Sequence, residues 1–355
     1  MTGPTLYPLR LTVPVKHHVF GGHAIAHRLG KRGIPDWSVA ETWECSDVDG
    51  NNGQVTNGPL AGRSLRQLVN EHPKELMGAG WSGEFFPVLT KFIDGAGTLP
   101  VHLHADDEAA RRLEGQPNGK TEAWHILDAA PGATALCGVE DGITAGQLRA
   151  ALESQDFDAV LRRLPVRAGE TIYVPGGTLH SFGPDTVIYE IEQTSDIQQH
   201  AMRRHMEDGS PVADDEFSAN LDMLMQEAQL NSRPDFVPGL ALPCGEAVGR
   251  VFLCAGPYFA LERWRVGTSG PLLRAFATAQ ILTNLGSPIT VRSGRRSEEL
   301  GRAQTLLLPA VCGEVEIRGP ADVLFGYLPD LDRDVVGPLA DAGYPSHLIE
   351  TLGVV

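Results

Sequence analysis

The sequence has few cysteines and no long apolar run. Its cysteines are scattered, odd in number and never spaced as Cys-x-x-Cys: Cys45, Cys137, Cys244, Cys254 and Cys312. This usage indicates reduced thiols in a cytosolic protein rather than a disulfide framework. Residues 1–10 lack a basic stretch followed by an apolar one, and no segment is long and apolar enough to span a bilayer. We therefore expect a cytoplasmic protein with no membrane partner.

Positive charge is also scarce. The chain has 29 Lys and Arg residues against 45 Asp and Glu residues, a formal net charge of −16. A negative surface repels phosphate backbones, so we expect no nucleic-acid partner. The sequence leaves open whether the protein is a monomer or a homodimer.

Glycine and proline, in contrast, are plentiful, with 40 and 25 residues in a chain of 355. The length predicts two domains, and the turn residues predict many short strands. Capping boxes at Ser64-x-x-Gln67 and Thr144-x-x-Gln147 predict helix starts. Phe217, Leu221 and Leu224 recur at helical spacing and are followed by three prolines. We therefore predict a β domain over 1–205, a helical connector over 206–248 and a second β domain over 249–355.

A set of histidines and one glutamate has the spacing of a metal site. His102-x-His104 lies in a predicted strand, whose alternation places both imidazoles on one face. Two such histidines alone are more often simply exposed or core residues. Glu122 lies in a further predicted strand, and Pro175-Gly-Gly-Thr-Leu-His180 is typical of the return strand of a cupin barrel. Three imidazoles and a carboxylate suit Zn, Mn, Fe, Ni or Co and leave coordination positions open. We predict one divalent metal per chain, and the donor types leave its identity open among these five.

Several segments carry a family resemblance: FPVLTKFID (86–94), HLHADDEAA (102–110), GKTEAWHILDAAPGA (119–133), YVPGGTLHSFG (173–183) and IYEIEQTSD (188–196). On these segments the chain resembles the class I mannose-6-phosphate isomerases, in particular their shorter bacterial form. The resemblance implies a mainly β fold, with two cupin-type jelly-roll β-barrel domains and helical insertions. The metal would lie in the N-terminal barrel. The C-terminal barrel, which has only His347 after Arg250, is expected to bind none.

The resemblance also implies an activity and a set of residues. Such enzymes interconvert an aldose and a ketose phosphate at a zinc site through a cis-enediol intermediate. By position, Glu122 and His180 match metal ligands of the family. Residues at or beside the remaining motif positions form two groups. The catalytic candidates are Lys120, Glu190, His200 and Arg203, and the substrate-binding candidates are Lys91, Asp196 and Arg204.

Four positions depart from the family pattern. His102 replaces a glutamine, and Phe20-Gly21 replaces a Trp-Gly pair. Pro100 replaces a serine implicated in phosphate binding, and proline offers neither a hydroxyl nor an N–H group. His200 replaces a catalytic arginine, whose place Arg203 or Arg204 could take only after a local shift. The loss of the serine and the displacement of the arginine both weaken recognition of a phosphate dianion. Mannose 6-phosphate and fructose 6-phosphate are the substrates that the resemblance implies, and a related sugar without the phosphate is the alternative.

Two other functions fit the same ligand set: a cupin dioxygenase or decarboxylase that uses Fe or Mn, and a non-catalytic sugar-binding cupin.

Some residues have plainer interpretations. We expect His125 to be structural because its strand parity is opposite to that of Glu122. We expect Asp106–Glu108 to begin a helix. The histidines near the chain start are expected to form a solvated patch rather than a second metal site; they are His17, His18, His23 and His27.

Overall fold

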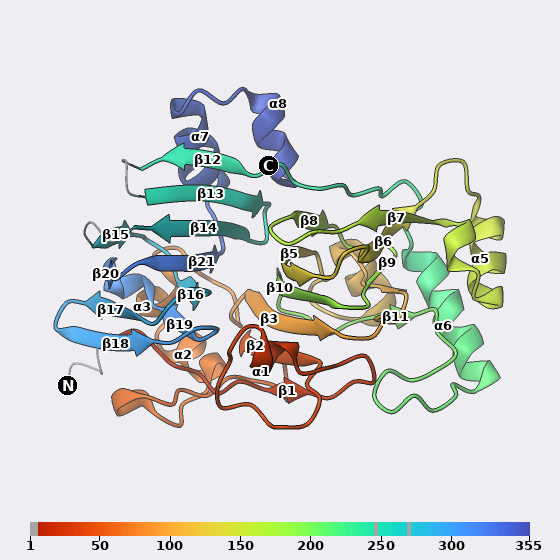
Figure 1. The fold of residues 1–355 in the computed structure, drawn as a ribbon, viewed down its shortest axis with the longest axis horizontal. Helices are drawn as coiled ribbons and strands as arrows, with labels where there is room; N and C mark the ends of the chain where they lie inside the picture. The colour runs from red at the N-terminus through yellow and green to blue at the C-terminus, as the bar shows by residue number, and fades with distance from the viewer. Residues whose placement is uncertain (1–5, 245–247, 268–270) are drawn as a thin grey trace.

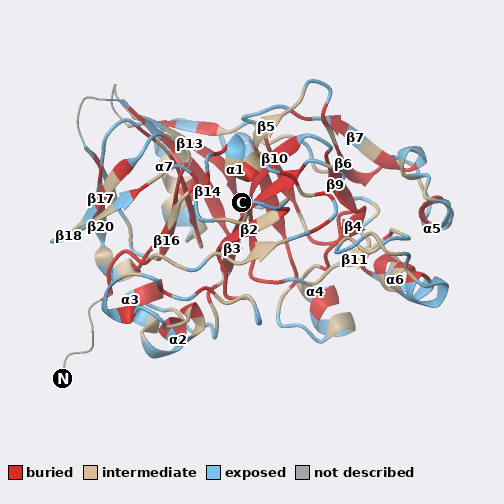
Figure 2. Cartoon of the chain, turned by 60° about the horizontal axis from the view of Figure 1, so that its bottom comes forward, coloured by how far each residue is buried: buried red, intermediate tan, exposed pale blue. Residues whose placement is uncertain are grey.

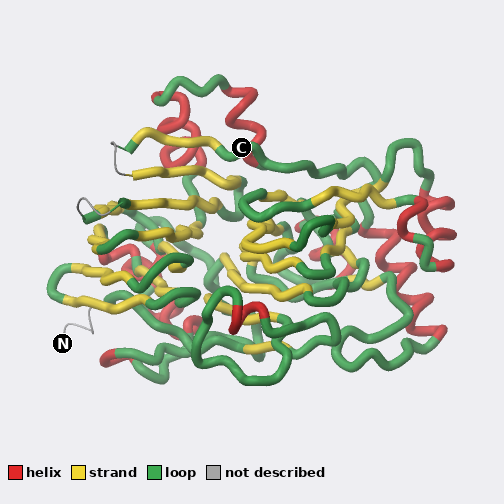
Figure 3. Tube along the Cα trace, in the orientation of Figure 1, coloured by secondary structure: helices red, strands yellow, loops and turns green. Residues whose placement is uncertain are grey.

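The computed structural model describes residues 6–244, 248–267 and 271–355. Residues 1–5, on which part of the expectation about the chain start rests, and residues 245–247 of the expected connector lie outside the described residues. The chain forms two antiparallel β-sandwiches that lie side by side along its long axis (Figure 1). Strands occupy the centre and most helices lie around them (Figure 3). The mainly β character predicted from the sequence is confirmed.

The first sandwich consists of a six-stranded and a five-stranded sheet. The order in the larger sheet is β1-β2-β3-β10-β5-β8 and in the smaller one β11-β4-β9-β6-β7. The larger sheet comprises β1 (Val15–Lys16), β2 (Glu41–Cys45), β3 (Val88–Gly95), β10 (Thr186–Gln193), β5 (Glu122–Ala129) and β8 (Thr171–Val174). The smaller sheet comprises β11 (Gln199–His200), β4 (His102–Leu103), β9 (His180–Phe182), β6 (Thr134–Val139) and β7 (Leu161–Pro165).

The second sandwich repeats this arrangement with sheets ordered β12-β13-β14-β21-β16-β19 and β15-β20-β17-β18. The first of these comprises β12 (Leu240–Pro243), β13 (Val248–Ala255), β14 (Ala260–Val266), β21 (Ala321–Tyr327), β16 (Gln280–Asn284) and β19 (Thr305–Leu308). The second comprises β15 (Leu272–Ala275), β20 (Glu314–Arg318), β17 (Ile289–Ser293) and β18 (Arg296–Leu300). Strand β12 falls inside the range expected to be a connector, yet it pairs with β13.

The helices are short, and several begin as the sequence predicts. Both capping boxes form, with Ser64 and Thr144 accepting from the backbone N–H groups of Gln67 and Gln147. Asp106 caps the turn that follows it, which confirms its plainer interpretation. None of the helices in the described ranges is long and apolar enough to cross a bilayer. They are α1 (Ala24–His27), α2 (Leu65–Glu71), α3 (Pro73–Met77), α4 (Asp107–Ala109), α5 (Ala145–Ser154), α6 (Asp214–Glu227), α7 (Gly337–Asp341) and α8 (Ser346–Ile349).

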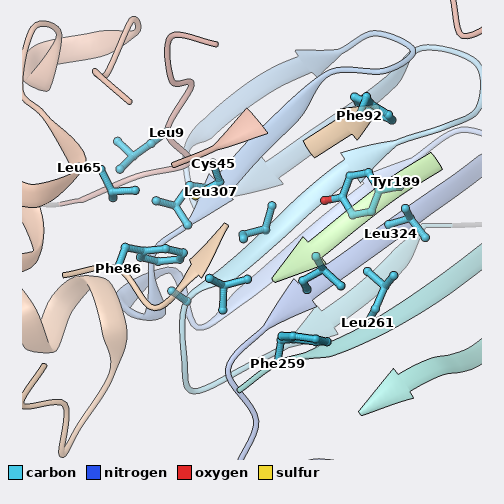
Figure 4. Close-up of a cluster of buried hydrophobic side chains, with 14 of the residues drawn as sticks. Leu9, Cys45, Leu65, Phe86, Phe92, Tyr189, Phe259, Leu261, Leu307 and Leu324 are labelled. Carbon is cyan, nitrogen blue, oxygen red and sulfur yellow. The ribbon is translucent and has the colours of Figure 1, made fainter. Parts of the chain in front are cut away.

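One hydrophobic core extends through both sandwiches. Phe92 of β3 and Tyr189 of β10 pack in the same cluster as Leu261 of β14 and Leu324 of β21 (Figure 4). These four side chains are fully buried, and buried residues (red) fill the central strands of both sandwiches (Figure 2). The Tyr189 hydroxyl also lies 3.0 Å from Oγ1 of Thr283 in β16. The second sandwich therefore supports the two central strands of the first.

Candidate metal centre and active-site cavity

The strands bring four metal-donor side chains together from both sheets of the first sandwich. On β4, His102 pairs with His180 of β9 on one side and with His200 of β11 on the other. Strand alternation places His104 on the same face as His102. Glu122 begins β5 in the larger, facing sheet. The donors therefore meet in the interior of the sandwich.

Glycines allow the segments that carry the donors to approach closely. A Cβ atom at Gly176 would lie 2.7 Å from the Cα of Asp106, which excludes any larger residue in this backbone position. Gly177 adopts φ of 83° and donates its N–H to the carbonyl of His104 over 2.6 Å. The Pro-Gly-Gly turn is thus tied to the His102–His104 segment, three residues before His180.

The donor atoms lie within coordinating reach of one another. The Nε2 atoms of His102 and His180 are 3.0 Å apart. Glu122 places Oε2 at 3.2 Å from His104 Nε2 and Oε1 at 3.3 Å from His180 Nε2. All four residues are at most 9% exposed. Oε2 of Glu122 is buried and lies beside both His104 Nε2 and Lys120 Nζ, so the carboxylate faces the imidazoles.

Backbone carbonyls fix the orientation of the three imidazoles. Nδ1 of His102 lies 2.8 Å from the carbonyl oxygen of Pro100. Nδ1 of His104 lies 2.7 Å from that of Ile197, and Nδ1 of His180 lies 2.8 Å from that of Thr178. A carbonyl oxygen only accepts, so each Nδ1 carries the proton and each Nε2 keeps its lone pair for a ligand bond. Proteins commonly orient metal-binding histidines in this way. The donor set therefore fits a divalent metal.

The electrostatics favour the same protonation states. Burial lowers the pKa of His102 and of His104 well below the usual range, and it lowers the pKa of His180 as well. Burial would raise the pKa of Glu122, but Lys120 and the neighbouring histidines outweigh it and hold that pKa at about 2. At neutral pH the site thus offers neutral imidazoles and an ionised carboxylate, which are the forms that bind a cation.

Two lysines and two further glutamates adjoin the donors. Register places Glu192 of β10 opposite Glu122, and Glu190 opposite Lys91 of β3. The Nζ atom of Lys120 lies 3.1 Å from Glu122 Oε2 and 3.0 Å from Glu192 Oε2, and 2.9 Å from His104 Nε2. Lys91 Nζ lies 3.0 Å from Glu192 Oε1 and 3.2 Å from Glu190 Oε2. Alternating charges thus stabilise a fully buried network.

A cavity of about 370 Å³ opens beside this network. Five of the candidate residues line it, and these are Lys91, Lys120, Glu190, Asp196 and His200. The His200 ring stacks on His102 at 5.6 Å between centroids, and burial lowers the pKa of His200 to about 4. Three metal donors also reach the cavity wall: His102, Glu122 and His180.

The structure does not bring the two candidate arginines to this cavity. Arg203 pairs with Asp214 at 3.1 Å and covers the ring of Phe217, with 46% of its side chain exposed. Arg204 donates to the carbonyl of Gly209 within an exposed turn. Neither residue lines the cavity.

The sequence interpretation missed three parts of the site. Glu192 was overlooked, although it lies two residues from Glu190 and so on the same strand face. Glu41 also lines the cavity, with Oε2 3.8 Å from Lys91 Nζ. The solvated-patch interpretation is wrong for His18, which is 8% exposed and lines the cavity. His17 lies at the same wall but is exposed.

Two other histidine interpretations agree with the structure. His23 and His27 are exposed and stack on each other at the protein surface. His125 lies away from the cavity. Its Nδ1 is 2.9 Å from Thr171 Oγ1, and its Nε2 is 3.0 Å from Arg263 of the second sandwich. This contact links the two sandwiches, which is a structural role.

No family model matches the chain, but individual proteins and solved structures do. The probable mannose-6-phosphate isomerase GmuF of Bacillus subtilis (strain 168) is 28% identical over 326 residues, 90% of this chain and 99% of the relative. The crystal structure of the mannose 6-phosphate isomerase from Bacillus subtilis aligns with a TM-score of 0.81 at 26% identity, over 91% of this chain and 100% of that one. A zinc-bound mannose 6-phosphate isomerase shares the fold, with a TM-score of 0.70 at 14% identity over 91% of this chain and 100% of that one.

The paired sandwiches and the buried imidazole and carboxylate donors define a cupin-type metalloprotein, as the sequence predicted. The relatives make the assignment more specific. Over about 90% of its length the chain is similar to mannose-6-phosphate isomerases, with 27–29% identity to three such relatives.

Proposed function

We propose that this protein is a metal-dependent aldose–ketose isomerase that binds one divalent ion per chain, zinc by preference. The observation that carries the proposal is the convergence of three oriented Nε2 atoms and Glu122 beside a buried lysine that contacts both His104 and Glu122. When bound, the ion would act as a Lewis acid toward the sugar oxygens. The family relationship points to mannose 6-phosphate and fructose 6-phosphate as reference substrates.

The chain's own residues can supply the remaining requirements of this chemistry. Isomerisation moves a proton between C1 and C2 through a cis-enediol, so it needs a base and a nearby positive charge. Lys120 suits the second role. Burial would lower its pKa, but Glu122 and Glu192 outweigh burial and raise it, so the amine stays an ammonium. Glu190 suits the first role, because its carboxylate lines the cavity beside the metal donors and is positioned by Lys91.

Lys91, Asp196 and His200 complete the proposed site. Lys91 holds Glu190 in place at 3.2 Å. Asp196 lines the cavity and offers a carboxylate to substrate hydroxyl groups, while His200 covers the His102 ring on the cavity side. Arg203 and Arg204 have no role in this proposal, because their guanidinium groups bind surface partners.

The test is a metal-loaded activity assay in deuterated water. Protein reconstituted with Zn, Mn, Fe, Ni or Co would be given mannose, mannose 6-phosphate and the corresponding ketoses. We expect interconversion with solvent deuterium entering at C1 or C2. An unchanged sugar pool with every metal, or products of oxidation or decarboxylation, would reject the proposal.

A further inference from the structure

The cavity beside the metal donors contains more negative than positive side chains. Carboxylates of Glu41, Glu122, Glu190, Asp196 and Glu207 line it. Among the residues that the structure describes, the cations on this wall are Lys16, Lys91 and Lys120, and none of the lining residues is an arginine. The carboxylates therefore outnumber the cations by two, which a divalent ion would offset without leaving positive charge for an anionic substrate.

Two of the three lysines already have carboxylate partners. Lys91 lies within 3.8 Å of oxygens from Glu190, Glu192 and Glu41. Lys120 lies within 3.1 Å of oxygens from Glu122 and Glu192. Because these groups are nearly excluded from water, a phosphate dianion approaching either lysine would meet the neighbouring carboxylates at close range.

Lys16 is the third cation and is less well suited to a dianion. Its Nζ donates to Oδ1 of Asn51 at 2.7 Å and lies 4.5 Å above the Trp43 ring. It is a single charge on a flexible stem, whereas tight phosphate recognition generally uses bidentate guanidinium groups or several donors.

The rest of the polar wall suits hydroxyl groups. Imidazoles of His17, His18 and His200 both donate and accept, and Asp196, Glu207 and Gln198 offer oxygen acceptors. Hydrogen bonds from hydroxyl groups to ionised carboxylates are short and strong. A neutral polyol can therefore bind at this wall without electrostatic repulsion.

We propose that the substrate of this site is an unphosphorylated aldose and its ketose, held through their hydroxyl groups by the acidic wall of the cavity. The inference rests on the isomerase function proposed above and specifies its substrate class. It distinguishes this chain from relatives whose names give mannose 6-phosphate as the substrate.

The experiment compares kcat/KM of the metal-loaded, full-length protein for mannose and fructose with that for their 6-phosphates. We expect at least a tenfold preference for the unphosphorylated sugars. A preference for the phosphate esters would overturn this inference and leave the proposed isomerase intact. No turnover of either class would reject the isomerase itself, and the inference with it.

Two variants identify the cause of the preference. Glu207→Gln removes one negative charge from the wall, and Asp208→Asn is the matched control at an exposed neighbour. We expect Glu207→Gln, but not Asp208→Asn, to shift the kcat/KM ratio at least threefold toward the phosphate ester. Equal ratios in both variants would contradict a charge-based selection.

Lys16→Gln tests the remaining route to phosphate binding. If Lys16 were a phosphate handle, this change would lower kcat/KM for the ester selectively, and that result would overturn the inference. We expect the ratio of the two kcat/KM values to change less than threefold, as in the exposed-lysine control Lys74→Gln.

Discussion

His102 and His180 face each other across paired strands with their Nε2 atoms 3.0 Å apart, and a backbone carbonyl holds each ring from behind through Nδ1. In these two neutral imidazoles the proton is on Nδ1, so neither Nε2 atom can donate a hydrogen bond to the other. A metal ion between them resolves this opposition of lone pairs, so the geometry makes metal binding directly testable.

We expect His104→Ala and His180→Ala to lose bound metal. Loss of an outer partner of a metal ligand typically weakens binding about 10- to 100-fold, so removal of a ligand is expected to exceed 100-fold. Elemental analysis of the purified variants measures this, with the exposed His347→Ala as control. Wild-type metal content in both ligand variants would show that these residues do not hold the ion.

We expect Lys120→Met to retain metal but to lose catalysis. The change removes the ammonium group that lies 2.9 Å from His104 Nε2 and 3.1 Å from Glu122 Oε2. Positioned proton-transfer and charge-stabilising groups contribute roughly 10²- to 10⁴-fold, so kcat is expected to fall by about that factor. Metal content and kcat are measured on the same preparation, beside Lys74→Met. A kcat within about threefold of wild type at full metal loading would exclude a catalytic role for Lys120.

We expect Lys31→Met to destabilise the protein strongly. Lys31 Nζ contacts Glu44 Oε2 at 2.7 Å and the carbonyl of Ala303 in the second sandwich at 2.8 Å, and both charged side chains are at most 4% exposed. An unpaired charge at Glu44 would cost about 3–5 kcal/mol, measurable by denaturant unfolding.

The double variant Lys31→Met/Glu44→Gln supplies the control for this prediction. Removing both charges is expected to recover more than half of the lost stability, because the penalty arises from the orphaned carboxylate. A double variant as unstable as Lys31→Met would instead point to lost packing.

We expect Glu227 to make folding pH-dependent on the alkaline side. Burial and the adjacent Glu114 raise the pKa of Glu227 from 4.5 to about 8. The folded state therefore binds more protons than the unfolded state between these values, so stability falls as pH rises through that range, at up to about 1.4 kcal/mol per pH unit.

Glu227→Gln tests this effect by removing the titrating group. Thermal melts from pH 5 to pH 9 are expected to show a flatter decline than wild type, while the exposed Asp215→Asn on the same helix keeps the wild-type slope. Identical slopes in wild type and Glu227→Gln would refute the assignment.

The sequence predicted that the four candidate donors would lie together, because short-range rules govern much of their placement. Strand alternation relates His102 to His104, and the Pro-Gly-Gly turn precedes His180 at a fixed distance. These short-range rules do not predict the place of Glu192, because its position opposite Glu122 depends on the pairing of β10 with β5. The burial of His18 depends on residues distant in the sequence, such as Glu41, whose Oε1 lies 3.7 Å from Nε2 of His18. The direction of Arg203 depends on its contact with α6. Long-range packing of this kind has no local sequence signature.

The shared core also limits how sequences of this kind can diverge. Leu261, Ile281 and Leu324 lie in the second sandwich, yet they pack in one cluster with Phe92 and Tyr189 of the strands that carry Lys91 and Glu190. The described residues that line the cavity all belong to the N-terminal part of the chain, from Val15 to Glu207. Removal of the second sandwich, the C-terminal barrel, would nevertheless expose the backs of the two strands that position the acidic network. We therefore expect the apolar core residues of this barrel to be as conserved among homologues as a catalytic residue, while its outward-facing positions vary freely.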